Sequence, residues 1–126
     1  MSVQQDLQWQ SLCNEQDLVA DAGIAAWTPD GPVALFWLPS QGGALFCIGH
    51  YDPLGQANVL ARGIVGDRQG EPVVASPLYK QHYSLLTGTC LEDGAIRVPV
   101  YPVRLSGGKV EIGLAREQGV RRDSAA

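Results

Sequence analysis

The feature that most constrains this chain is a pair of apolar segments, each of which runs directly into a loop that contains proline. The stronger one spans residues 73–88 (VVASPLYKQHYSLLTG). It predicts a short strand, a loop at Pro77, a second strand and a Thr-Gly turn. A weaker copy of the pattern at residues 44–54 (ALFCIGHYDPL) again predicts an apolar strand and then a loop, here at Pro53. The two units therefore predict β-structure on both sides of a glycine-rich connection.

Short strands separated by turn signals account for most of the remaining chain. Residues 24–27 and 33–38 predict a hairpin, because the linker between them contains two prolines and a glycine. Residues 58–66 predict a short strand pair that turns at Arg62 and Gly63. Further strands are expected at 9–13 and 44–48, at 95–105 as an edge strand with two prolines, and at 109–112 in a terminal hairpin. With no convincing helical period, the fold class is predicted to be all-β, an antiparallel β-sandwich or small barrel.

A chain of 126 residues is long enough for one domain with its own core. We expect a flexible N-terminus at residues 1–8, the folded domain at 9–113, and a disordered tail at 114–126, where the sequence is polar and interrupted by glycine. Five aromatic residues fall in the predicted strands and are expected to lie mostly in the core: Trp27, Phe36, Trp37, Phe46 and Tyr83.

The net charge of the chain disfavours some classes of binding partner. A net charge of −4 disfavours nucleic acid and anionic membranes as the main partner, and no apolar run reaches the roughly 20 residues of a membrane span. The N-terminal residues lack the basic and apolar regions of a signal peptide, so we expect a cytoplasmic protein. In that reducing compartment the three cysteines are expected to remain thiols.

The two strand-and-loop units resemble the cluster-binding half of a Rieske iron–sulfur domain. In that family the first loop carries Cys-x-His and the second Cys-x-x-His, and these four side chains hold a [2Fe–2S] centre. The resemblance places Asp52 and Leu54 on the first pair of ligand positions, and Ser76 and Tyr79 on the second pair. Leucine has no donor atom, and the other three offer oxygen where cluster iron needs thiolate or imidazole. The resemblance therefore implies a Rieske-like scaffold, with both proline loops at one tip, that binds no metal.

Within this group the chain is most similar to the small subunits of assimilatory NADH-dependent nitrite reductase. The similarity is carried by residues 52–53 (DP), 58–67 (NVLARGIVGD), 74–81 (VASPLYKQ) and 87–93 (TGTCLED). It implies a cytoplasmic partner subunit that holds FAD, iron–sulfur centres and sirohaem and carries electrons from NADH to nitrite. This chain is then expected to have no catalytic residues and no cofactor of its own. The residues expected to contact the large subunit are Pro53, Arg62, Pro77, Lys80 and Gln81.

Three other interpretations of the residues remain open. Cys47 and His50 have a Cys-x-x-His spacing, but a buried cysteine and a hydrogen-bonding turn histidine explain them better than a metal site does. His82 and Ser76 suggest a base and a nucleophile, although a solvated strand histidine is the simpler interpretation. At the level of the whole protein, the alternatives are a Rieske-type ferredoxin with non-standard ligands and a stand-alone β-sandwich binding module.

Overall fold

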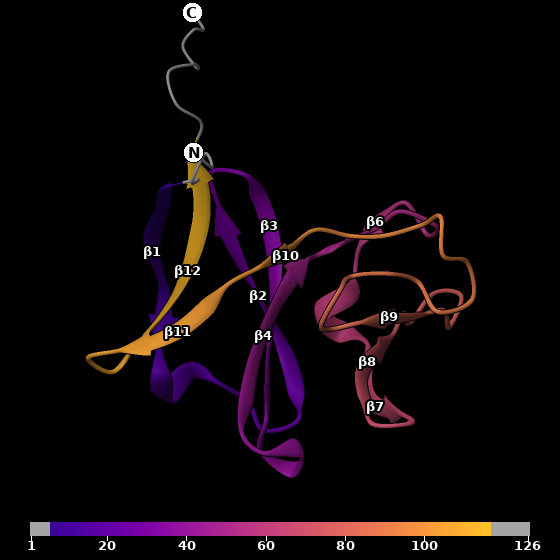
Figure 1. Cartoon of the computed structure of the whole chain (residues 1–126), viewed down its shortest axis with the longest axis horizontal. Coiled ribbons are helices and arrows are strands. Elements are labelled where there is room, and N and C mark those ends of the chain that lie inside the picture. The colour runs from indigo at the N-terminus through magenta and orange to yellow at the C-terminus, as the bar shows by residue number, and fades with distance from the viewer. Residues whose placement is uncertain (1–5, 117–126) are drawn as a thin grey trace, which may run out of the picture.

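A computed structural model describes residues 6–116, and in this part of the chain almost all regular structure is β-strand (Figure 1). Short 3₁₀ turns connect some of the strands: η1 (Glu15–Asp17), η2 (Pro39–Gln41) and η3 (Leu60–Arg62). Among residues 6–116 no helix is long and apolar enough to cross a membrane. The predicted all-β fold class is confirmed.

The central sheet has four antiparallel strands in the order β10-β4-β3-β2. They are β2 (Ala22–Thr28), β3 (Gly31–Leu38), β4 (Ala44–Gly49) and β10 (Val100–Tyr101). The predicted hairpin is present, since β2 and β3 pair from Ala22 with Trp37 to Thr28 with Gly31. Gly31 has a φ of 114°, a conformation that glycine adopts without a steric penalty.

Strand β3 is buried on both faces, which explains its nearly continuous apolar sequence. Because side chains alternate across a strand, Ala34, Phe36 and Leu38 face one core cluster, while Val33 and Leu35 face the other. The first cluster lies toward the proline loops and contains Val74, Tyr83 and Leu85 among others. The second lies toward the paired ends of the chain and contains Val110, Ile112 and Leu114.

The first and last strands of the described chain form a second sheet with the order β1-β12-β11. Its strands are β1 (Asp6–Asn14), β11 (Val103–Ser106) and β12 (Lys109–Arg116). The proline-containing stretch 95–105, predicted as one edge strand, divides into β10 and β11 on two different sheets.

The remaining strands build the unit that carries the proline loops, on the opposite side of the molecule from β1 and β12 (Figure 1). Here β5 (Tyr51–Asp52) pairs with β6 (Ala57–Asn58). In the neighbouring sheet β8 (Glu71–Ala75) lies between β7 (Ile64–Arg68) and β9 (His82–Ser84).

The prediction of a strand pair within residues 58–66 is wrong. Strand β6 ends at Asn58, and the backbone then makes the 3₁₀ turn η3, in which the Gly63 amide donates to the Leu60 carbonyl at 3.0 Å. Leu60 and Ala61 are buried in the first core cluster, and an apolar run of this length is equally compatible with a buried strand and a buried turn. Strand β7 pairs with β8 instead.

Strand pairing extends beyond residues 9–113 at both ends of the described chain. Strand β1 begins at Asp6, and β12 continues to Arg116, because the two pair across their whole length. Leu114 lies opposite Gln8 and is buried. The rest of the predicted flexible ends, 1–5 and 117–126, lies outside the described residues.

Trp27 differs from the expectation that it lies mostly in the core. It lies on the edge strand β2, and its side chain is 73% exposed.

Candidate functional site

The first proline loop connects β5 to β6 and is shaped by Asp52. One oxygen of its carboxylate, Oδ1, accepts a hydrogen bond from the Leu54 amide at 3.0 Å, as aspartate does in Asx turns. The Asp52 carbonyl accepts a second bond from the Gln56 amide at 2.6 Å. Gln56 itself has a φ of 56°, in the left-handed region. Asp52 therefore caps its own turn.

The second proline loop connects β8 to β9 and is closed by Ser76. Its backbone amide donates to the Gln81 carbonyl at 2.8 Å, and its carbonyl accepts from the Lys80 amide at 3.0 Å. Lys80 has a φ of 66°, which turns the chain back toward β9. The Ser76 hydroxyl oxygen, Oγ, accepts from the Leu78 amide at 3.3 Å, so the side chain also holds its own loop.

The two loops are joined by a buried hydrogen-bond network centred on Asp52. The Ser76 hydroxyl donates to Asp52 Oδ2 at 2.5 Å, and the Tyr83 hydroxyl donates to Asp52 Oδ1 at 2.8 Å. All three side chains are almost completely buried. Buried polar groups require partners, and here each group in the network has at least one. The prediction that the loops lie together at one tip is confirmed by these contacts.

Asp52 is held in its ionised form. Burial on its own raises the pKa of the carboxyl group. The hydrogen bonds from Ser76, Tyr83 and the amides of Gly55 and Leu54 together outweigh this effect and lower the pKa below its usual value. The pKa of the neighbouring Tyr83 phenol shifts in the opposite direction, because burial and the adjacent carboxylate raise it. At neutral pH the network is therefore a carboxylate that accepts from two neutral hydroxyl groups.

These residues do not fit a [2Fe–2S] cluster. Asp52 and Ser76, on two of the ligand positions, bond directly to each other, and a 2.5 Å contact leaves no space for a metal ion between their oxygens. Leu54 has no donor atom. Tyr79 is 67% exposed and offers only a phenol. The donor set and the geometry both disagree with cluster binding.

The loops present an exposed, mainly apolar surface, which we call the tip. Leu54 is 37% exposed, Leu78 is 44% exposed, and Pro77 and Tyr79 are also exposed. Leu78 packs across the first loop, because a Cβ atom built on Gly55 would lie 2.4 Å from Leu78 Cδ1. We use the name "tip" for these residues: Leu54, Gly55, Pro77, Leu78 and Tyr79.

Four of the residues predicted to contact a partner lie in the two proline loops, the fifth lies at the end of η3, and they differ in exposure. Pro77 and Lys80 are exposed on the second loop, and Arg62 is exposed at the end of η3. Pro53 is half-buried. Gln81 is also half-buried, and its side-chain oxygen Oε1 is buried without a hydrogen-bond partner among the described residues.

Cys47 and His50 have the structural roles that the sequence favoured. Cys47 lies in the second core cluster, where burial raises the pKa of its thiol to about 12. His50 is buried, and its Nδ1 atom accepts a hydrogen bond from the Ala61 amide at 3.1 Å. Burial and the nearby Arg62 lower the pKa of His50, which favours the neutral acceptor form. Within residues 6–116 no three potential metal-ligating side chains of His, Cys, Asp or Glu form a metal-binding group.

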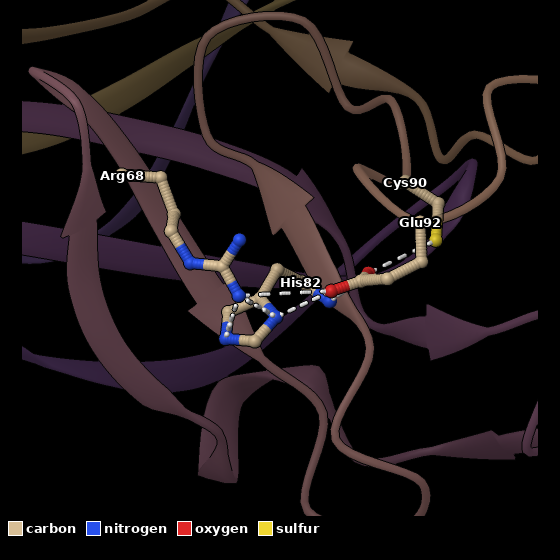
Figure 2. Close-up of polar contacts among 4 residues, drawn as sticks. All are labelled: Arg68, His82, Cys90 and Glu92. Atoms are coloured by element: carbon tan, nitrogen blue, oxygen red, sulfur yellow. Dashed lines mark hydrogen bonds and ion pairs between the residues drawn. The ribbon is translucent and has the colours of Figure 1, made fainter.

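A second polar cluster surrounds His82 at the start of β9 (Figure 2). Glu92 accepts from the His82 backbone amide at 2.8 Å, and its other oxygen lies 2.7 Å from His82 Nδ1. Arg68 lies against the imidazole ring with its NH2 atom 3.1 Å from Nδ1, and the Cys90 thiol donates to Glu92 at 3.7 Å.

Sequence reasoning treated His82 as a solvated residue and did not find this cluster, whose members are spread over 25 positions. The cluster attaches the segment after Cys90 to β9. Ser76 donates its hydroxyl to Asp52 rather than to His82, so the structure does not bring the suggested nucleophile and base together as a pair.

Comparisons with known proteins give a consistent result. The family model for the Rieske-like [2Fe–2S] domain matches residues 8–113. A nitrite reductase (NADH) small subunit from Salmonella typhimurium is 38% identical over 105 residues, which cover 83% of this chain and 96% of that protein. A crystal structure from Mycobacterium tuberculosis, described as an NADH-dependent nitrite reductase small subunit, superposes with a TM-score of 0.82 at 37% identity. It covers 89% of this chain and 99% of the other. The NAD(P)H nitrite reductase large subunit of Klebsiella oxytoca is 38% identical over 105 residues, which cover only 11% of its own length.

Proposed function

Because this chain belongs to the Rieske-like [2Fe–2S] domain family, among the small subunits of NADH nitrite reductase, we propose that it is the small subunit of such an enzyme and has no catalytic site of its own. In this proposal it docks on a large subunit in the cytoplasm. The large subunit holds FAD, iron–sulfur centres and sirohaem and carries electrons from NADH to nitrite, which yields ammonium for nitrate assimilation. This chain contributes a binding surface and no cofactor.

The observation that carries the non-redox role is the bond between Asp52 and Ser76. Two positions that correspond to cluster ligands in the Rieske family hold a carboxylate and a hydroxyl group, and these two groups form a hydrogen bond with each other. Support for docking on a large subunit comes from the Klebsiella oxytoca protein, in which a segment similar to this chain occurs within the large subunit itself. We propose the tip as the contact surface, because exposed apolar side chains that lie together commonly mark protein–protein interfaces.

Co-expression with the large subunit tests this proposal. The double variant Lys80→Glu with Arg62→Glu reverses two charges beside the tip, and we expect it to weaken co-purification. Because Arg104 pairs with Glu111 at 2.8 Å and lies over the Trp9 ring, it is left unchanged in the control. The matched pair is Lys80→Glu alone and Lys109→Glu, which makes the same change in net charge on the β11–β12 hairpin, away from the proline loops (Figure 1). The control is expected to co-purify as the unmodified chain does.

Three outcomes would contradict parts of the proposal. Association of Lys80→Glu and of the Lys80→Glu, Arg62→Glu double variant equal to that of Lys109→Glu would show that the interface lies elsewhere than at the tip. Stoichiometric iron and sulfide in the anaerobically purified chain would replace the non-redox role with that of an electron carrier. A chain that remains monomeric and never associates with the large subunit would favour a stand-alone binding module.

A further inference from the structure

We propose that Asp52, Ser76 and Tyr83 are positioning residues that tie the two proline loops into a single preformed docking tip. This inference rests on the proposed function, because the tip is the surface that we assign to the large subunit. It goes further by naming the side chains that fix the shape of this surface, none of which is itself exposed on it.

The need for such a tie follows from the construction of the tip. Its apolar side chains come from two loops that are separated in sequence by the whole of β6, η3, β7 and β8. Loops are the most mobile parts of a fold, and a surface divided between two of them has one shape only if the loops move together. A preformed surface loses less conformational entropy when a partner binds.

The network connects the backbones of both loops at the residues that form the tip. The Leu54 amide donates to Asp52, whose other oxygen accepts from the Ser76 hydroxyl. The Ser76 oxygen in turn accepts from the Leu78 amide. This unbroken chain of hydrogen bonds runs from Leu54 in one loop to Leu78 in the other, and these two residues supply exposed apolar side chains of the tip.

Tyr83 fixes this chain of hydrogen bonds to the body of the domain. It lies on β9 with its ring in the first core cluster, and its hydroxyl donates a hydrogen bond to Asp52 from the core side of the loops. Hydrogen bonds to a buried carboxylate are charge-assisted and are stronger than those between neutral groups. The tip is therefore held both from loop to loop and from loop to core.

The chain offers a matched control for Ser76. Ser84 is another buried serine whose hydroxyl donates to a carboxylate, that of Glu71, at 2.5 Å, and its oxygen accepts from the amides of Leu86 and Thr87. It lies at the opposite end of the β8–β9 pair, since Glu71 begins β8 and Ser84 ends β9. Ser84→Ala should cost stability as Ser76→Ala does without loosening the tip.

The experiment compares Ser76→Ala, Tyr83→Phe and Ser84→Ala in the full chain. Hydrogen exchange of the Leu54 amide is measured by NMR, and affinity is measured by titration of the purified large subunit with each variant. We expect Ser76→Ala to accelerate exchange at Leu54, in the other loop, by roughly tenfold and to weaken binding by a similar factor, the size expected for one lost hydrogen bond to a charged group. Tyr83→Phe should act in the same direction. Ser84→Ala should leave both quantities within about twofold of wild type, because it removes no bond of the network.

The results separate this inference from the proposed function. Unchanged Leu54 exchange in both Ser76→Ala and Tyr83→Phe would overturn the tie between the loops. Wild-type affinity in those two variants would overturn its role in docking while leaving the proposed function intact. Failure of the wild-type chain to bind the large subunit would overturn the proposed function, and the exchange measurement would still decide whether the loops are tied. Should Ser76→Ala fail to fold, Tyr83→Phe keeps the test decisive.

Discussion

Replacing Tyr83 with phenylalanine removes one donor from the network and leaves the rest of it in place. The ring keeps its position in the first core cluster, so no large cavity forms. Asp52 still accepts from Ser76 and from the Leu54 amide, so the buried carboxylate is not left without partners. The measured effect therefore isolates the hydrogen bond from the phenol to the carboxylate.

The magnitude follows from the burial and the geometry of that bond. Donor and acceptor are both fully buried and lie 2.8 Å apart, and the acceptor is charged. Hydrogen bonds of this kind contribute about 1.5–3 kcal/mol, and we expect a loss of about 2 kcal/mol in the free energy of unfolding. With an m-value of about 2 kcal/mol per molar urea, the midpoint of unfolding falls by about 1 M.

Urea unfolding at pH 7, followed by tryptophan fluorescence, measures this loss. Tyr101→Phe serves as the control, because it removes the hydroxyl of a different tyrosine, which is only partly buried and makes no hydrogen bond with Asp52. A double-mutant cycle with Asp52→Asn should give a coupling energy of at least about 1 kcal/mol between the two positions. A loss below about 0.5 kcal/mol for Tyr83→Phe, the usual range of surface substitutions, would refute the reasoning.

Three further predictions concern acid stability, close packing and thiol reactivity. The folded-state pKa of Asp52 lies below its usual value of 3.8. The ionised carboxylate therefore contributes fully to the free energy of unfolding above pH 3.8, and this contribution is lost as the pH falls through the folded-state pKa. In urea titrations, the stability difference between wild type and Asp52→Asn should shrink below about pH 4. Gly63→Ala should lower the free energy of unfolding by about 1–3 kcal/mol, because its Cβ would lie 2.4 Å from the Ala75 carbonyl oxygen. A Cβ atom at Gly94 would meet nothing within 4 Å, so Gly94→Ala should change the free energy of unfolding little. Equal effects of Gly63→Ala and Gly94→Ala would contradict the close approach of Gly63 to the Ala75 carbonyl. Cys47 should resist alkylation in the native state at pH 8, as measured by mass spectrometry, because it is buried and its thiol pKa is about 12; rapid labelling would show that the core opens.

Local patterns in the sequence predicted most of the strands and both proline loops, whereas the meeting of the two loops was implied only by the resemblance to Rieske domains. Alternation and turn residues define the β2–β3 hairpin, and the proline loops are marked by Pro53 and Pro77. The 3₁₀ turn η3 was mistaken for strand, since the apolar run through Leu60 does not distinguish the two. The exposure of Trp27 depends on β2 being an edge strand, which is a property of the sheet order and not of the local sequence.

The network at the site was only partly predictable. The oxygen donors at Asp52 and Ser76 were visible in the sequence. The bond between them joins residues 24 positions apart, and the bond from Tyr83 joins residues 31 positions apart. Tyr83 was predicted only as a core aromatic, because nothing in the sequence shows where its hydroxyl points. A buried tyrosine hydroxyl does require a partner, and that requirement is the signal that could have prompted a search for one.

The pairing of β1 with β12 has a consequence for how this domain can be built into larger proteins. Asp6 lies opposite Arg116, so the two ends of the described chain lie at one corner, on the side away from the proline loops (Figure 1). The same module can therefore be used as a separate polypeptide or as a covalent appendage, and neither form requires the point of attachment to lie at the proline loops.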